Sequence, residues 1–106
     1  MAADPLERLR AMRGGPRDGA LLRVSLANAL VAQDDRAGAI DELRQALGFD
    51  PDYSAAWKLL GKTLADSGDS VAAINAYEQG IAAAIKRGDK QAQKEMQVFL
   101  KRLQKV

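Results

Sequence analysis

Two lysines one helical turn apart are the residues of this chain best placed to bind a charged ligand. Lys58 and Lys62 are separated by four positions, so in a helix their side chains lie on the same face. Two ammonium groups at this spacing can share one anion through charge-assisted hydrogen bonds. The alternative is that both are ordinary solvated lysines on an exposed helix face.

Residues that could carry catalysis are scarce. Acidic side chains cluster at 34–35, 41–42 and 50–52, which are predicted helix ends or exposed faces, where capping and solvation account for them. The chain has no cysteine and no histidine, so the thiolate nucleophile, the Cys-type zinc site and the usual general base are missing. No glycine-rich phosphate loop, zinc-binding helix motif or nucleophile elbow is present. We therefore predict no enzyme, no cofactor and no metal site.

Positive charge is concentrated at the carboxyl end of the chain. The net charge of +2 divides into −3 for residues 1–85 and +5 for residues 86–106. The cations of this last segment are Lys86, Arg87, Lys90, Lys94, Lys101, Arg102 and Lys105. A run of this kind is compatible with a nucleic acid or an acidic partner. No aromatic residues are interleaved for base stacking, however, and helix C-termini favour cations, so the prediction is a solvated polar face.

Length and hydropathy place the chain in the class of small, one-domain proteins. At 106 residues it can bury roughly two thirds of its unfolded surface without disulfides. The first ten residues carry four charges with no apolar run behind them, so they do not resemble a signal peptide. No stretch of about 18 uncharged apolar residues could span a membrane. We expect a soluble, cytoplasmic protein.

Six helices are predicted from the periodicity of apolar residues and from their flanking signals. They cover approximately residues 4–13, 18–33, 35–48, 52–67, 70–86 and 90 to near the end. The predicted caps of the first three helices are Asp4, Asp18 and Asp35, and Asp4 forms a capping box with Glu7. Gly48 is predicted to take a left-handed conformation where the third helix stops before Pro51.

Helices in the middle of the chain repeat at a spacing of 34 residues. The segment 35–40 matches 69–74, and the same spacing relates Leu26 to Leu60, Leu30 to Leu64, Leu43 to Tyr77 and Ala46 to Gly80. A fixed period of this length is typical of stacked helical hairpins. The short loops require consecutive helices to pack antiparallel, and the hairpins must stack to bury their apolar faces.

These residues resemble the signature of the tetratricopeptide repeat family, short stand-alone versions of which occur in bacteria. The matching positions are Leu26, Ala27, Leu30, Ala39, Leu43, Ala46 and Pro51 in the first repeat and Trp57, Leu60, Gly61, Leu64, Ala73, Tyr77 and Gly80 in the second. Arg23 stands where a large aromatic residue is typical, and Ile85 replaces the closing proline, so the fifth helix should be longer than usual. The resemblance implies an all-α fold, a right-handed stack of antiparallel helical hairpins.

The expected domain is one unit of four segments. An N-terminal helix and linker at 1–17 precede repeats at 20–53 and 54–87, and a capping helix at 88–106 closes the stack. Small residues at Ala27, Gly61, Ala39 and Ala73 are expected where helices approach closely.

The family resemblance implies that the second, fourth and sixth helices form a concave surface for a peptide or helix of another protein. The candidate contacts are Asn28, Lys58, Lys62, Val24, Val31 and Met96. Asn28 with Lys58 and Lys62 is partly similar to the family's clamp for a terminal carboxylate, although the third repeat of that clamp is absent. Trp57, Tyr77 and Phe99 are predicted to belong to the core.

Two other functions remain open. A short stack could form a homodimer through Phe99, Leu100, Leu103 and Val106. Binding of a nucleic acid or an acidic partner through the basic last helix is the weaker alternative. Neither requires catalysis, and neither involves a membrane.

Overall fold

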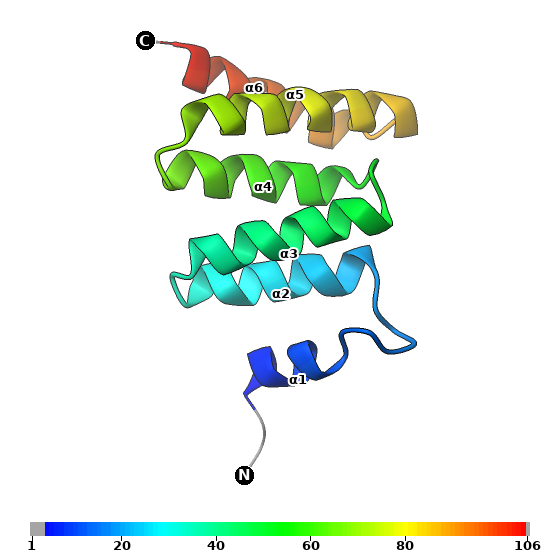
Figure 1. Ribbon diagram of the computed structural model, residues 1–106. Coiled ribbons are helices and arrows are strands. Elements are labelled where there is room, and N and C mark those ends of the chain that lie inside the picture. Colours follow the sequence, from blue (N-terminus) through cyan, green and yellow to red (C-terminus); the bar gives the residue numbers. More distant parts are fainter. Residues whose placement is uncertain (1–3, 106) are drawn as a thin grey trace.

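The computed structural model describes residues 4–105, which form six α-helices joined by short turns (Figure 1). The helices are α1 (Pro5–Ala11), α2 (Ala20–Ala32), α3 (Arg36–Phe49), α4 (Ser54–Asp66), α5 (Ser70–Arg87) and α6 (Lys90–Gln104). They stack in chain order, so α1 and α6 lie at opposite ends of a body measuring 48 × 28 × 19 Å. The predicted all-α stack of helical hairpins is confirmed.

Aspartate caps begin four of the helices. The predicted cap Asp4 accepts a hydrogen bond of 3.0 Å from the Leu6 backbone N–H at the start of α1. The Asp35, Asp69 and Asp89 carboxylates each accept a hydrogen bond from the backbone N–H three residues later, at 2.9, 3.1 and 3.1 Å. A cap of this kind stabilises a helix by roughly 1 kcal/mol. At the other end of α5, Gly88 takes the left-handed conformation with φ 73°. The fifth helix is the longest, as predicted from Ile85.

Two predicted details of the helix ends are wrong. Gly48 does not take a left-handed conformation, because α3 continues through it to Phe49 and the chain becomes extended at Asp50, before Pro51. Asp18 does not cap the second helix, where Gly19 is the N-cap and makes no side-chain bond. The Asp18 carboxylate is instead engaged by the Arg23 guanidinium, which offers two donors at 2.8 and 2.9 Å.

The core is built largely from the residues that repeat at 34 positions. Of the fourteen signature positions, twelve are buried, whereas Trp57 is half-buried and Pro51 is exposed. The Trp57 Nε1 donates a hydrogen bond of 2.7 Å to the Pro51 carbonyl, so its polar atom is satisfied at the edge of the core. Leu6 of the short helix α1 is buried against this core as well.

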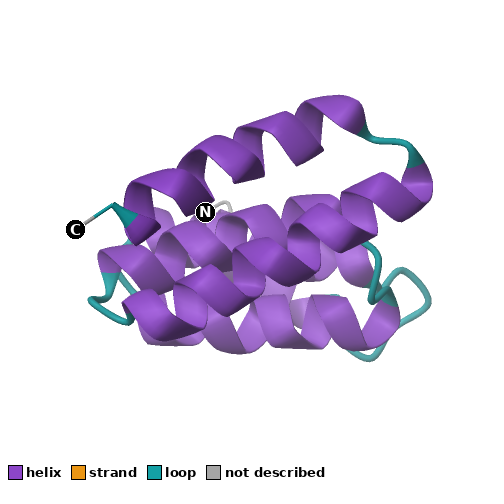
Figure 2. Ribbon diagram, turned by 90° about the horizontal axis from the view of Figure 1, so that it is seen from above, coloured by secondary structure: helices purple, strands orange, loops and turns teal. Residues whose placement is uncertain are grey.

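The stack is curved toward α2, α4 and α6. These three helices form a contiguous layer, since α4 contacts both α2 and α6, whereas α3 and α5 do not contact each other within residues 4–105. Closer spacing on one side of a stack makes that side concave. Figure 2 shows the helices from above, nested along one another with the connecting turns at both ends.

A half-buried ionic cluster joins the α1–α2 connection to α2 and α3. The Arg23 guanidinium reaches Asp18 at 2.8 Å and Glu42 at 3.4 Å, and Arg13 reaches Glu42 at 3.1 Å. The side chains of Asp18, Glu42 and Arg23 are only 8, 9 and 13% exposed. Arg23 also lies 5.7 Å from the centre of the Phe49 ring. A charged network thus occupies the place of the large aromatic residue that is typical of the repeat.

The charge network predicts a specific loss of stability in acid. Hydrogen bonds from Arg23 and from the Gly14 backbone N–H lower the pKa of Asp18 far below its usual range. A carboxyl whose pKa is lower in the folded state stabilises the fold above its unfolded pKa near 4, and this stabilisation is lost as the pH falls. We expect Asp18→Asn to be less stable than the wild type at pH 7 and to lose less of its remaining stability on acidification.

Urea unfolding followed by circular dichroism between pH 7 and pH 3 measures this difference. Asp41→Asn removes an equal charge from an exposed position of α3 and is the control. If Asp18→Asn and wild type lose equal stability over this range, the ion pair of Asp18 does not contribute to folding.

Candidate binding groove on α2, α4 and α6

Side chains from three helices converge in a groove on the concave side. Its central cavity, of about 300 Å³, is lined by Val24 and Asn28 of α2, Ala55, Lys58, Leu59 and Lys62 of α4, and Glu95 and Phe99 of α6. Four of the six predicted contact residues, namely Val24, Asn28, Lys58 and Lys62, are therefore neighbours in space. The 34-residue repeat explains this, because it places equivalent faces of α2 and α4 side by side.

The two lysines do not form an open pair of ammonium groups. Lys58 Nζ lies 3.5 Å from Glu95 Oε1, and Lys62 Nζ lies 2.9 Å from Asp66 Oδ2. All four side chains are more than a third exposed, and ion pairs at such positions contribute roughly 0–1 kcal/mol. An incoming charged group could therefore compete for either lysine, but each lysine already has a carboxylate partner.

The prediction that Met96 contacts a partner is wrong. Its side chain is completely buried, and its sulfur would lie 2.5 Å from a Cβ placed on Gly80. Met96 is one turn from the buried Ala92 and therefore on the face of α6 that packs against α5. Val31 is 36% exposed on α2 but is not part of the cavity lining, whereas Val24 is only 8% exposed and lies at its base.

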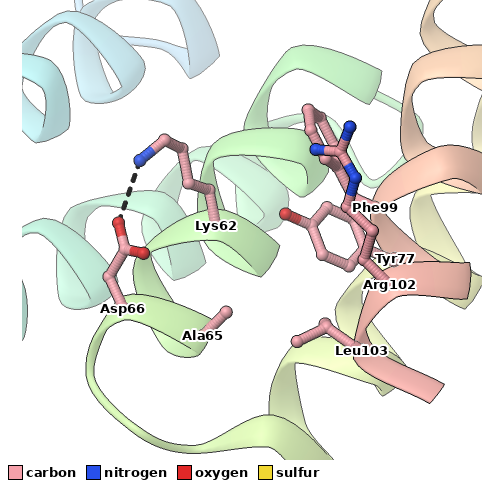
Figure 3. A pocket seen from close by; sticks show the side chains of 7 residues that line it. All are labelled: Lys62, Ala65, Asp66, Tyr77, Phe99, Arg102 and Leu103. Atoms are coloured by element: carbon pink, nitrogen blue, oxygen red, sulfur yellow. Dashed lines mark hydrogen bonds and ion pairs between the residues drawn. The ribbon is translucent and has the colours of Figure 1, made fainter. Parts of the chain in front are cut away.

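The groove continues toward the carboxyl ends of α4 and α6 into a second cavity of about 200 Å³ (Figure 3). Its lining consists of Lys62, Ala65, Asp66, Tyr77, Phe99, Arg102 and Leu103. Lys62 and Phe99 border both cavities, so the two are contiguous. At the opposite end, a shallower hollow is bordered by Ala55, Lys58 and Glu95, and the Ser54 hydroxyl lies 3.1 Å from the Asp89 carboxylate.

Residues of α6 complete the groove, and the sequence prediction missed them. Glu95 and Arg102 line it, together with Phe99, which was predicted to be a core residue and is half-buried. The Arg102 guanidinium lies 5.8 Å from the centre of the Phe99 ring, and that ring is 5.7 Å from the Tyr77 ring. Positions 95, 99 and 102 follow one another at helical spacing along the border of the apolar face, and this spacing was the available signal.

The residues proposed for a homodimer are partly used inside the chain. Phe99, Leu100 and Leu103 pack against the buried cluster of α5 and α6 and are half-buried, whereas Val106 lies outside the described residues. Part of the basic segment is likewise engaged inside the chain. Lys86 and Arg87 form ion pairs with Asp52 and Asp50, at 2.8 and 2.6 Å.

Membrane and metal sites are not found in the described part of the chain. None of the helices within residues 4–105 has both the length and the apolar character needed to cross a bilayer. In the same range, no three acidic, histidine or cysteine side chains are grouped so that they could hold a metal ion.

Comparisons of sequence and of structure both find related proteins. A sequence model described as tetratricopeptide repeat matches residues 30–94. The chain is 44% identical over 101 residues to a TPR repeat-containing protein of Pseudomonas aeruginosa, covering 95% of this chain and 96% of that protein. It is 48% identical to a protein of Bordetella parapertussis with a solution structure, at a TM-score of 0.81 and coverage of 96 and 89%. A crystal structure of a tetratricopeptide repeat domain protein from Salinibacter ruber gives 26% identity, a TM-score of 0.76 and coverage of 81 and 97%.

Proposed function

We propose that this chain, which belongs to the tetratricopeptide repeat family, docks a peptide or helix of another protein in the α2–α4–α6 groove. Proteins of this family are generally non-catalytic scaffolds that bind other proteins, and we propose that this chain likewise catalyses no reaction. The proposed domain has repeats at 20–53 and 54–87, flanked by the segments 1–17 and 88–106. Binding would take place on a largely preformed surface, with Asn28, Lys58 and Lys62 as polar contacts.

The observation that carries this proposal is the mixed chemistry of the central cavity. Val24 on one side and Phe99 on the other supply apolar surface, and Lys58 and Glu95 supply opposite charges between them. A groove with an apolar base and a charged border suits an amphipathic segment, because apolar area provides affinity and the charges fix orientation. Both lysine ion pairs are weak enough to be exchanged for contacts with a partner.

A photo-crosslinking experiment tests where the partner binds. The crosslinking residue p-benzoylphenylalanine is placed at Asn28, inside the groove, or at Gln45, an exposed position on α3 in the opposite layer. In a lysate of the source organism, we expect one or a few specific adducts from position 28 and none of these from position 45. Adducts are identified by mass spectrometry of the crosslinked bands.

Charge reversal then tests the polar contacts. We expect Lys58→Glu/Lys62→Glu to reduce the yield of the specific adducts at least fivefold, because two cations on the groove border become anions. Arg36→Glu/Arg44→Glu makes an equal change in net charge on α3 and should leave the yield within twofold. The same adducts from positions 28 and 45, or equal losses in both charge-reversed variants, would place the binding surface elsewhere.

A further inference from the structure

The hydroxyl of Tyr77 lies at the base of the second cavity without a partner. Tyr77 is 2% exposed, and its hydroxyl points toward the Lys62 side of the cavity (Figure 3). It takes part in no hydrogen bond with residues 4–105. Burial raises the pKa of Tyr77 to about 12, so the hydroxyl is protonated at neutral pH and can donate. No side-chain nitrogen or oxygen of the described residues is both buried and without a partner, so this hydroxyl is reached from the cavity and is free to donate to an oxygen atom of a ligand.

The cavity has the size and the lining for one apolar side chain. Ala65 of α4 and Phe99 and Leu103 of α6 form its walls around the Tyr77 ring. Its volume of about 200 Å³ is enough for one large side chain, and it is contiguous with the central cavity through Lys62 and Phe99. A polypeptide that anchors one side chain here can therefore continue along the groove.

The border of the cavity on α6 is positively charged. Lys62 and Asp66 on the α4 side neutralise each other at 2.9 Å. Arg102 on the α6 side has no carboxylate within ion-pair distance among the described residues. Beyond Arg102, a shallow surface on α6 is lined by Val98, Lys101, Gln104 and Lys105, and it adjoins the cavity through Arg102 itself. A chain leaving the cavity over α6 would cross three cations in succession.

We propose that this end of the groove recognises an acidic segment of a partner protein, with one apolar side chain anchored against Tyr77 and its neighbouring carboxylates lying over Arg102, Lys101 and Lys105. The inference rests on the proposed function, because it names the partner chemistry of that groove. It also extends the binding surface beyond the concave side and onto the outer face of α6. Arg102 connects the two parts, since it borders both the cavity and the outer surface.

An acidic protein segment suits this surface better than the other polyanions. A nucleic acid would use the cations but would have no aliphatic side chain for the cavity, and the outer surface beyond Arg102 offers no aromatic ring for stacking. A lipid bilayer would require an apolar helix face, and the apolar face of α6 is packed against α5.

Selection from a displayed library of random 12-residue peptides tests the inference. Enriched peptides are synthesised with a fluorescent label, and their Kd values are measured by fluorescence anisotropy. We expect a leucine or aromatic residue flanked by aspartate or glutamate. Arg102→Glu/Lys105→Glu should weaken binding at least tenfold. Lys90→Glu/Lys94→Glu, an equal charge change at the other end of α6, should weaken it less than threefold. Tyr77→Phe, which removes only the hydroxyl, should weaken it about fivefold.

The outcomes separate this inference from the proposed function. Peptides without acidic residues, or equal losses in the two α6 variants, overturn the inference, while sensitivity to Lys58→Glu/Lys62→Glu would still support docking in the groove. If no enriched peptide loses affinity for Lys58→Glu/Lys62→Glu or for Arg102→Glu/Lys105→Glu, both the inference and the proposed function are contradicted. Displacement of the peptide by a 20-nucleotide single-stranded DNA, with the same dependence on Arg102 and Lys105, would identify a nucleic-acid surface and overturn the inference.

Discussion

Alanine at position 61 is expected to destabilise the protein by about 1–2 kcal/mol, although alanine is the better helix former. Gly61 lies in the middle of α4, where α5 crosses it. A Cβ added there would lie 2.6–2.8 Å from three ring atoms of Tyr77. The ring cannot move aside easily, because Tyr77 is buried and packs against Phe99. Overpacking costs about 1–3 kcal/mol, and contacts this close to a buried ring belong to the upper part of that range. The cost therefore exceeds the helix-propensity gain of about 1 kcal/mol.

Gly48 is the matched control. It also lies within a helix, but a Cβ added at this position meets no atom within 4 Å. Gly48→Ala should therefore stabilise the protein, by up to about 1 kcal/mol. Thermal unfolding followed by circular dichroism distinguishes the two variants, since 1 kcal/mol shifts the Tm of a domain of this size by roughly 4–8 °C. A raised Tm for Gly61→Ala would show that the α4–α5 contact is looser than described.

The first repeat suggests a second change that would offset the overpacking in Gly61→Ala. At the positions equivalent to Gly61 and Tyr77 it carries Ala27 and Leu43, both fully buried. In the second repeat the larger side chain, Tyr77, therefore packs against the smaller residue, Gly61. We expect Gly61→Ala/Tyr77→Leu to be more stable than the sum of its single changes predicts, by at least about 1 kcal/mol.

The fold was predictable because its determinants are local and repeated. Apolar residues at helical spacing, aspartate caps at Asp4 and Asp35, and short turns identify the helices from the sequence alone. The two errors at helix ends have different causes. Asp18 is a good capping residue, but Arg23 engages its carboxylate. Gly48 can take a left-handed conformation, but α3 continues through it to Phe49 and ends one residue later.

The groove was predictable only in part. The faces of α2 and α4 follow from the repeat, so Val24, Asn28 and the two lysines could be placed together. Helix α6 lies outside the period, and its rotation about its own axis is set by packing that the sequence does not reveal. This is why Met96, expected in the groove, is buried beside Gly80, whereas Arg102 borders the groove. The carboxylates that pair with the lysines, Glu95 and Asp66, likewise depend on side-chain positions in the folded state.

Arg23→Trp is expected to destabilise the protein by about 2 kcal/mol, even though it restores the residue type that is typical of the repeat. The change removes the guanidinium that contacts both Asp18 and Glu42. Asp18 retains hydrogen bonds from the Gly14 and Gly19 backbone N–H groups, both at 2.8 Å. Glu42 is left with only Arg13 and is 9% exposed. A carboxylate that loses a cation in such an environment is costly, because burial has removed most of its water.

The second repeat identifies the compensating change. At the positions equivalent to Arg23 and Glu42 it carries Trp57 and Ala76, so an aromatic residue there stands opposite a small apolar one. Glu42→Ala alone should cost about 1 kcal/mol, since Arg23 keeps both bonds to Asp18. In Arg23→Trp/Glu42→Ala no carboxylate remains at position 42, and the indole can occupy the space of the removed side chain. We expect the double variant to be more stable than Arg23→Trp.

A double-mutant cycle in urea measures the coupling directly. Independent sites add to within about 0.5 kcal/mol, whereas members of one charge network couple by roughly 0.5–3 kcal/mol. We expect a favourable coupling of at least about 1 kcal/mol between positions 23 and 42. Additive losses would mean that Arg23 and Glu42 stabilise the fold independently. The first repeat would then depart from the aromatic pattern for a reason other than its buried glutamate, because removal of Glu42 would not make room for the tryptophan.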